Sequence, residues 1–226
     1  MNNIICVIPA RSGSKGIKDK NVKELGGKPL LVWTIETAFK AGLQRIVVSS
    51  DSDEYGKIAK EFGAEFLKRP IELAQDDISM YQVLKSEVPK LDPLPEIVVL
   101  LSPTVPFREA ILIKTALSFF TSNLDNYDSL MAVMRIPHKY HPDQAIVTTP
   151  LGVRMANGSP LSNRKTRRQE YNPAYVTSQG LYIFKTSNLE KGSFYGERVM
   201  LQECDESLDI NSESDFLLAE SYLKEK

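Results

Sequence analysis

Residues 4–21 read IICVIPARSGSKGIKDKN, and this stretch decides the fold. Its first part, residues 4–8, is short, rich in β-branched side chains and wholly apolar. Such a run is typical of a strand buried on both faces at the centre of an α/β sheet. Pro9 ends the run, and the glycines and serines that follow let the backbone turn tightly and direct N–H groups toward a ligand. A loop that follows a central strand is where α/β sheets bind phosphorylated ligands.

The same loop concentrates positive charge. It carries Arg11, Lys15, Lys18, Lys20, Lys23 and Lys28 against only Asp19 and Glu24. Cations this close in sequence repel one another, and a bound polyanion relieves that repulsion. The loop matches neither the Walker A pattern nor the G-x-G-x-x-G dinucleotide pattern. We interpret it as a triphosphate cradle, and the alternative is a solvated, lysine-rich turn.

Strand and helix patterns alternate along the rest of the chain. Apolar runs predict strands at residues 45–50, 64–68, 96–101, 129–135, 180–185 and 199–204, and helical spacing predicts helices at 29–39, 54–62, 78–88, 109–120 and 215–224. Short connections between alternating elements imply parallel strands with right-handed crossovers, so we expect an α/β fold. The chain is predicted to form one domain over residues 1–226.

Residues 137–178 differ from the rest of the chain. They are polar and rich in proline, and only short strands near residues 144–148 and 152–156 are plausible. We expect this segment to leave the sheet as a lid or an oligomer contact. His138, His141 and Asp143 are too closely spaced in a proline-bracketed turn for a convincing tetrahedral metal site.

Composition limits the function. The chain has 226 residues and a formal net charge of -1, which argues against a general nucleic-acid or membrane binder. No stretch approaches membrane-spanning length. The two cysteines, Cys6 and Cys204, lie in apolar runs and are expected to be free thiols in a reducing compartment. We therefore expect a cytoplasmic protein that binds neither nucleic acid nor membranes.

Two further features outside the first loop carry charge. Asp209 lies between a predicted strand and the last helix, where its carboxylate could hold Mg²⁺ on a nucleotide's phosphates. The alternative is that Asp209 caps that helix. A second basic cluster, residues 164–168, is either a solvated loop or a source of ligand contacts, and Arg168 is our choice within it.

Several motifs together resemble those of the N-acylneuraminate cytidylyltransferases, the CMP-sialic acid synthetases. The first loop resembles that family's nucleotide signature, with its Arg, Ser-Lys-Gly and Lys-Asn at the same intervals. The other matches are Lys68-Arg69-Pro70-Ile71-Glu72-Leu73-Ala74 with Ser79, the run 101–108 (LSPTVPFR), His141-Pro142, Arg168-Gln169, Tyr182, Phe194-Tyr195 and Leu208-Asp209-Ile210. The resemblance covers nearly the whole chain.

The resemblance implies a three-layer, Rossmann-like nucleotidyltransferase fold with a mainly parallel mixed sheet, and a dimerisation or lid extension at about 137–178. It implies transfer of CMP from CTP to the anomeric hydroxyl of a 2-keto-3-deoxy sugar acid, with release of pyrophosphate, use of Mg²⁺ and a homodimer. Carried over by position, the nucleotide set is Ala10, Arg11, Ser12, Gly13, Lys15, Lys20, Asn21 and Ser79, of which Arg11, Lys15 and Lys20 are the predicted catalytic residues. The predicted sugar set is Ser102, Arg168, Ser178, Tyr182, Phe194 and Tyr195, and the predicted metal ligands are Asp209 and Asn211.

The sequence departs from the family pattern at the sugar side. Ser102 stands where the family has glutamine, and the family's R-P-N-G aligns with residues 176–179. Asn211 replaces a second metal aspartate, although its carbonyl oxygen is still able to bind Mg²⁺. We therefore expect a nine-carbon sugar acid other than N-acetylneuraminate, of the pseudaminic or legionaminic kind. The alternatives are another sugar nucleotidyltransferase of this fold, or a nucleotide-binding protein that has lost turnover.

Overall fold

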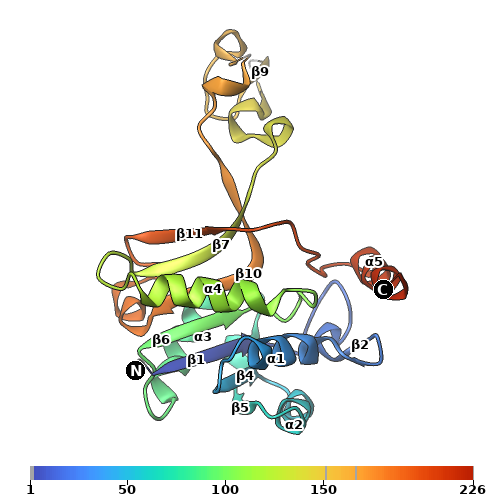
Figure 1. Cartoon of the computed structure of the whole chain (residues 1–226). Helices are drawn as coiled ribbons and strands as arrows, with labels where there is room; N and C mark the ends of the chain where they lie inside the picture. Colours follow the sequence, from blue (N-terminus) through green and yellow to red (C-terminus); the bar gives the residue numbers. More distant parts are fainter. Residues whose placement is uncertain (1–2, 151, 166, 226) are drawn as a thin grey trace.

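A seven-stranded mixed sheet forms the centre of the molecule, with strand order β11-β7-β10-β6-β1-β4-β5. The computed structural model describes residues 3–150, 152–165 and 167–225 (Figure 1). The strands are β1 (Ile4–Pro9), β4 (Ile46–Ser50), β5 (Glu65–Lys68), β6 (Ile97–Leu101), β7 (Ser129–Arg135), β10 (Tyr175–Lys185) and β11 (Val199–Glu203). Only β10 runs antiparallel to its neighbours. The predicted α/β fold with a mainly parallel mixed sheet is confirmed.

Helices cover both faces of this sheet. On one face α1 (Leu30–Lys40), α2 (Asp53–Glu61) and α4 (Ala110–Thr121) pack against side chains that include Cys6 and Ile8. On the other face α3 (Met80–Glu87) packs against Ile5 and Val7. Successive side chains of β1 therefore enter opposite cores, as the run of apolar residues predicts. No helix in the described residues has the length and apolar character needed to cross a bilayer.

The predicted helices and strands agree with the structure except near β10. That strand begins at Tyr175, not near residue 180, because Val176 and Thr177 pair with Met134 and Val133 of β7. A break in register between Thr177 and Tyr182 interrupts the strand. Polar residues at this break hide the strand from a sequence pattern. A small hairpin of β2 (Glu24–Leu25) and β3 (Lys28–Pro29), not predicted, follows the first loop.

The predicted excursion from the sheet starts after β7 and returns in β10. It carries a second hairpin, β8 (Ile146–Thr149) and β9 (Gly152–Met155), close to the strands expected there. Figure 1 shows this segment standing away from the sheet and its helices. Three apolar side chains of the hairpin are exposed, Ile146, Val147 and Val153.

The last helix, α5 (Glu213–Lys224), closes over the first loop. Ser212 caps it and forms a capping box with Asp215. Phe216 packs in a small core that includes Ile17 and Leu25 from the N-terminal segment. This packing holds residues 205–211 near the first loop.

Candidate active site

A cleft of about 1030 Å³ opens at the carboxyl ends of β1 and β6. The chain proceeds from β1 to β4 on one side and places β6 on the other, so the cleft lies at a topological switch point of the sheet. The predicted residues that line it are Arg11, Lys15, Lys20, Asn21, Ser79, Ser102, Ser178, Tyr182, Phe194, Tyr195, Asp209 and Asn211. The fold therefore brings the predicted nucleotide, metal and sugar residues into one cavity.

The first loop is held at both of its ends. The Ser12 backbone N–H and hydroxyl donate to the two carboxylate oxygens of Asp51, at 2.8 and 2.5 Å. The Asn21 side chain donates to the Arg11 carbonyl at 3.0 Å. Gly16 lies against the C-terminal segment, since a Cβ there would come within 2.3 Å of the Asn211 carbonyl oxygen. Contacts within the protein thus define the shape of the loop.

Two of the predicted catalytic cations are paired with one carboxylate. Arg11 and Lys15 contact the two oxygens of Asp76 at 2.6 and 2.5 Å. Hydrogen bonds from Lys15 and Arg11 lower the pKa of Asp76. Asp76 comes from the connection between β5 and α3, so a side chain outside the loop holds both cations together.

The third cation, Lys20, reaches the C-terminal segment. Its ammonium group donates to the Ile210 carbonyl at 2.7 Å. Partial burial lowers the pKa of Lys20, and the nearby carboxylates Asp209 and Asp215 act in the opposite direction. A charged group of a ligand in the cleft would therefore meet a cation that is already partly desolvated.

Asp209 is held by the hydroxyl of Thr104 and does not cap α5, so the capping alternative is wrong: the cap is Ser212. The Thr104 hydroxyl donates to Asp209 at 2.5 Å, and the Ser102 hydroxyl lies 2.8 Å from that of Thr104. Because Thr104 gives its only proton to Asp209, Ser102 is the donor to Thr104. The Ile210 N–H also donates to the Thr104 carbonyl at 2.9 Å. Thr104 thus fixes this segment through both side chain and backbone.

The donors at this end of the cleft suit Mg²⁺. Asp209 is exposed, and Asn211 lines the same cavity. The described residues hold no group of three or more His, Cys, Asp or Glu side chains that could bind a metal alone. Mg²⁺ commonly takes one or two protein carboxylates and completes its shell with substrate phosphates and water. The residues present therefore fit a metal that arrives with a nucleotide.

Aromatic side chains form the other end of the cleft. Tyr182 makes edge contacts with Phe194 and Tyr195, at ring-centroid distances of 5.8 and 6.1 Å. Phe194 and Tyr195 lie 4.1 Å apart. Such a surface presents an apolar wall with phenol groups available for hydrogen bonds. The side chain of Arg168, the remaining predicted sugar residue, lies outside the part of the chain that the structure describes.

The break in β10 falls at the segment that the resemblance aligns with the R-P-N-G motif, residues 176–179. Gly180 has φ of +51°, and a Cβ there would lie 2.4 Å from the Ser102 Cβ, so only glycine fits. Gln179 has a left-handed φ of +61°, and its carbonyl accepts from Arg108 Nε at 2.5 Å.

Arg108 holds this corner of the site from inside the protein. It is buried, and its Nη2 donates to the Ser102 carbonyl at 3.0 Å. Burial lowers the pKa of Arg108 to about 10. One guanidinium therefore links the end of β6 to the break in β10, and it keeps the strained turn at Gln179 in place.

Some predicted residues do not face the cleft, and some that do were not predicted. Ala10 is fully buried in the core, Ser12 is tied to Asp51, and Gly13 does not line the cavity. Arg69, Thr104 and Gln179 line it without having been chosen. Arg69 is buried, and its guanidinium donates to Ser49 Oγ at 2.8 Å. The Ser49 hydroxyl in turn donates to Glu87 at 2.5 Å. Each of these three residues lies in or beside a motif that resembles those of the family, so the motifs could have indicated them.

Comparison with known proteins agrees with this geometry. The sequence profile of a family described as Cytidylyltransferase matches residues 5–207. The chain belongs to the cytidylyltransferase family. A solved structure of a CMP:2-keto-3-deoxy-manno-octonic acid synthetase complexed with CTP superposes with a TM-score of 0.74 over 98% of both chains, at 17% identity. At that identity the likeness shows the shared fold.

Two curated relatives of this chain differ in how much of their length it covers. An N-acylneuraminate cytidylyltransferase of Escherichia coli O18:K1:H7 is 35% identical over 96% of this chain and 51% of its own length. A Post-translational flagellin modification protein B of Campylobacter coli is 30% identical over 100% of this chain and 97% of its own. This chain thus spans about half the length of the first relative and nearly all of the second.

Proposed function

We propose that this cytidylyltransferase transfers CMP from CTP to the anomeric hydroxyl of a sialic-acid-like, nine-carbon 2-keto-3-deoxy sugar acid. The observation that carries the proposal is the single cleft that joins the cationic loop, Asp209 and the aromatic wall. The cationic loop suits a triphosphate, Asp209 suits the metal that accompanies it, and the aromatic wall offers a surface on which a sugar ring stacks. The identity to N-acylneuraminate cytidylyltransferases supports the same assignment.

The chemistry depends on positioning and on charge. The anomeric hydroxyl attacks the α-phosphorus and loses its proton to solvent, while the bond between that phosphorus and the pyrophosphate oxygen breaks and pyrophosphate leaves. Arg11 and Lys15 leave Asp76 to bind phosphate oxygens, while Lys20 keeps the C-terminal segment against the loop. Cations placed along the triphosphate neutralise the charge that builds on the leaving pyrophosphate.

Asp209 and Asn211 would hold a Mg²⁺ ion that enters with CTP. When bound, the ion supplies positive charge to the phosphate oxygens. Asp209 is kept in place for that role by Thr104, and Asn211 is kept near by the backbone N–H that it donates to Asp215 at 2.9 Å.

The sugar acid is proposed to differ from N-acetylneuraminate. Ser102 points its hydroxyl to Thr104 and so serves the metal side of the cleft, where the family's longer glutamine would extend further. In the segment aligned with the R-P-N-G motif, Val176 stands in place of the arginine and Ser178 in place of the asparagine, and valine cannot bind a carboxylate. We therefore propose a sugar acid of the pseudaminic or legionaminic kind, and the similarity to a flagellin modification protein, 97% of which this chain covers, leaves room for a substrate other than N-acetylneuraminate.

We further propose a homodimer and a cytoplasmic location. The hairpin of β8 and β9 stands away from the sheet with Ile146, Val147 and Val153 exposed, which is the kind of surface that a partner covers. Light scattering should give twice the chain mass, and an Ile146→Asp variant should give the single mass. The location rests on the cysteines, which are both free thiols.

The phosphate loop is tested by a Lys15→Ala variant. Loss of one phosphate contact should raise KM for CTP about tenfold, because a charge-assisted contact of this kind contributes roughly 1.5 kcal/mol. Lys57→Ala, on the exposed side of α2 and away from the cleft, is the matched control and should behave as the parent protein. Normal turnover by Lys15→Ala would remove the loop from the proposed site.

A further inference from the structure

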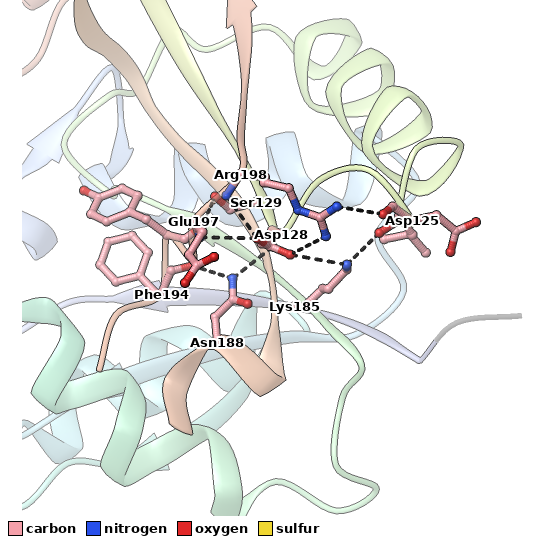
Figure 2. Close-up of polar contacts among 10 residues, drawn as sticks. Asp125, Asp128, Ser129, Lys185, Asn188, Phe194, Glu197 and Arg198 are labelled. Carbon is pink, nitrogen blue, oxygen red and sulfur yellow. Dashed lines mark hydrogen bonds and ion pairs between the residues drawn. The ribbon is translucent and has the colours of Figure 1, made fainter. Parts of the chain in front are cut away.

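The two aromatic residues at the sugar end of the cleft lie on one short segment of irregular structure. Phe194 and Tyr195 fall between the 3₁₀ segment η8 (Thr186–Lys191) and β11. A segment without its own ladder of hydrogen bonds needs other groups to hold it. Figure 2 shows that polar side chains from β7, its preceding residue and η8 converge on it.

Asp128, the residue before β7, binds the far end of this segment. One carboxylate oxygen accepts the backbone N–H groups of Glu197 and Arg198, at 3.2 and 3.0 Å. The other accepts from the Arg198 guanidinium at 3.1 Å and lies 3.8 Å from the Lys185 ammonium group. The Asp128 N–H also donates to the Arg198 carbonyl at 2.8 Å. Every oxygen of this buried carboxylate is therefore used on the segment or on a cation beside it.

Two neighbouring side chains hold the aromatic residues themselves. The Ser129 hydroxyl donates to the Tyr195 carbonyl at 2.5 Å. The Asn188 amide donates to the Phe194 carbonyl at 3.1 Å and to the Asp128 carbonyl at 2.9 Å. Ser129 and Asn188 are 2% and 1% exposed, so water cannot replace these bonds without opening the core.

The chain geometry at this point requires close contact. Gly196 has φ of +71°, and a Cβ there would lie 2.5 Å from the Asp128 Cβ and 3.1 Å from the Asn188 amide nitrogen. Only glycine both adopts this backbone conformation freely and lets the segment approach Asp128. The turn that follows Tyr195 is therefore set against the carboxylate.

We propose that Asp128 is a positioning residue for recognition of the sugar acid, acting through the backbone of residues 194–198. It contacts no ligand itself, because it does not line the cleft. Instead it fixes the segment whose rings form the aromatic wall with Tyr182. This inference rests on the proposed function, and it assigns the sugar end of that site a support of its own, separate from the phosphate loop.

The positioning role requires the negative charge and both carboxylate oxygens of Asp128. In an Asp128→Asn variant one oxygen becomes an NH₂ group, which cannot accept, so the side chain loses its charge and the acceptor for either the backbone N–H groups or the guanidinium. The segment would loosen, while the phosphate loop at the other end of the cleft keeps its shape. Displacement of about 1 Å in a binding group is enough to reduce catalysis by up to about 10²-fold.

KM for CTP and KM for the sugar acid are measured separately in variants of the full chain. For Asp128→Asn we expect KM for the sugar acid to rise about tenfold, the loss of one charge-assisted bond, with KM for CTP unchanged. Hydrogen exchange of the Glu197 and Arg198 amides should accelerate in the same variant. Ser129→Ala removes only the bond to the Tyr195 carbonyl and should shift the sugar KM in the same direction. It provides the test if Asp128→Asn folds poorly.

Glu65→Gln is the matched control. It breaks a paired carboxylate–guanidinium contact, with Arg45 at 2.7 and 3.0 Å, at the opposite edge of the sheet. It should leave both KM values unchanged. The inference is overturned if Asp128→Asn and Ser129→Ala leave the sugar KM unchanged, or if KM for CTP rises equally. Failure of the proposed function would look different, since the parent protein would then release no pyrophosphate from CTP with any sugar acid.

Discussion

Gly16 in the first loop lies directly against the backbone of Asn211, close enough that a Cβ at residue 16 would come within 2.3 Å of the Asn211 carbonyl oxygen. This contact joins the cationic loop to the segment that carries Asp209. The two halves of the proposed triphosphate site are therefore set by one close backbone approach.

A Gly16→Ala substitution should separate these halves. The methyl group has backbone in front of it and cannot be relieved by a side-chain rotation, so the loop or the C-terminal segment must move. We expect kcat/KM to fall roughly 10²-fold. Gly13→Ala in the same loop meets no atom within 4 Å and should lose far less. Equal losses from the two variants in a pyrophosphate-release assay would show that the Gly16 contact is unimportant.

Asp76 should compete with the triphosphate for Arg11 and Lys15. In an Asp76→Asn variant the cations lose their carboxylate partner, and we expect CTP to bind about threefold more tightly at low salt, with the gain lost as salt rises. Titration calorimetry at two ionic strengths measures this. Asp77→Asn, the neighbouring exposed carboxylate, is the control. Weaker binding by Asp76→Asn would instead mean that Asp76 helps to hold the nucleotide complex.

Thr104 should set the affinity of the metal site. In Thr104→Val the hydroxyl that donates to Asp209 is gone, while the backbone bond to Ile210 remains. We expect the Mg²⁺ concentration for half-maximal activity to rise about tenfold, as is common when a ligand loses its supporting hydrogen bond. Thr104→Ser keeps the hydroxyl and should restore the parental value. Mg²⁺-dependent protection against thermal unfolding in the presence of CTP should change in parallel, and an unchanged metal dependence would contradict the role.

Asp128 should also influence how stability depends on pH. Bonds from the Arg198 side chain and backbone, with the Glu197 N–H, hold the pKa of Asp128 at about 2, below its ordinary value of 3.8. A carboxyl group whose pKa is lower in the folded state stabilises the folded protein at pH values above its pKa in the unfolded state. This stabilisation is lost as the pH falls through the pKa of the folded state. The melting temperatures of the parent protein and Asp128→Asn should therefore differ by a constant amount above about pH 5 and converge between about pH 4 and 2. A difference that stays constant down to pH 2 would contradict this assignment.

The sequence predicts the fold well where apolar pattern and turn residues agree. The run at residues 4–8 makes β1 a central strand, and Pro29 with Gly42 bounds α1 within a residue or two. The start of β10 could not be predicted in the same way. Polar residues 178–179 and Gly180 divide β10 into two short apolar parts, and its pairing with β7 is interrupted between Thr177 and Tyr182.

The residues that line the cleft could be predicted better than the residues that hold them in place. The motifs pointed to Lys15, Lys20 and Asp209, which line the cleft. Asp128 was not predicted because its partners, Glu197 and Arg198, lie 69 and 70 residues away along the chain. Only the sheet order, which places β7 beside β11, brings them together. Long-range polar contacts of this kind leave no local pattern in a sequence.

The most direct test of the whole account is pyrophosphate release from CTP and Mg²⁺ with a panel of sugar acids. The panel should include N-acetylneuraminate, a pseudaminic acid, a legionaminic acid and an eight-carbon 2-keto-3-deoxy acid. The account predicts CTP-dependent release with a nine-carbon acid other than N-acetylneuraminate, at a kcat/KM well above that for the other sugars. Equal turnover of N-acetylneuraminate and the other nine-carbon acids, or no release with any of them, would contradict it.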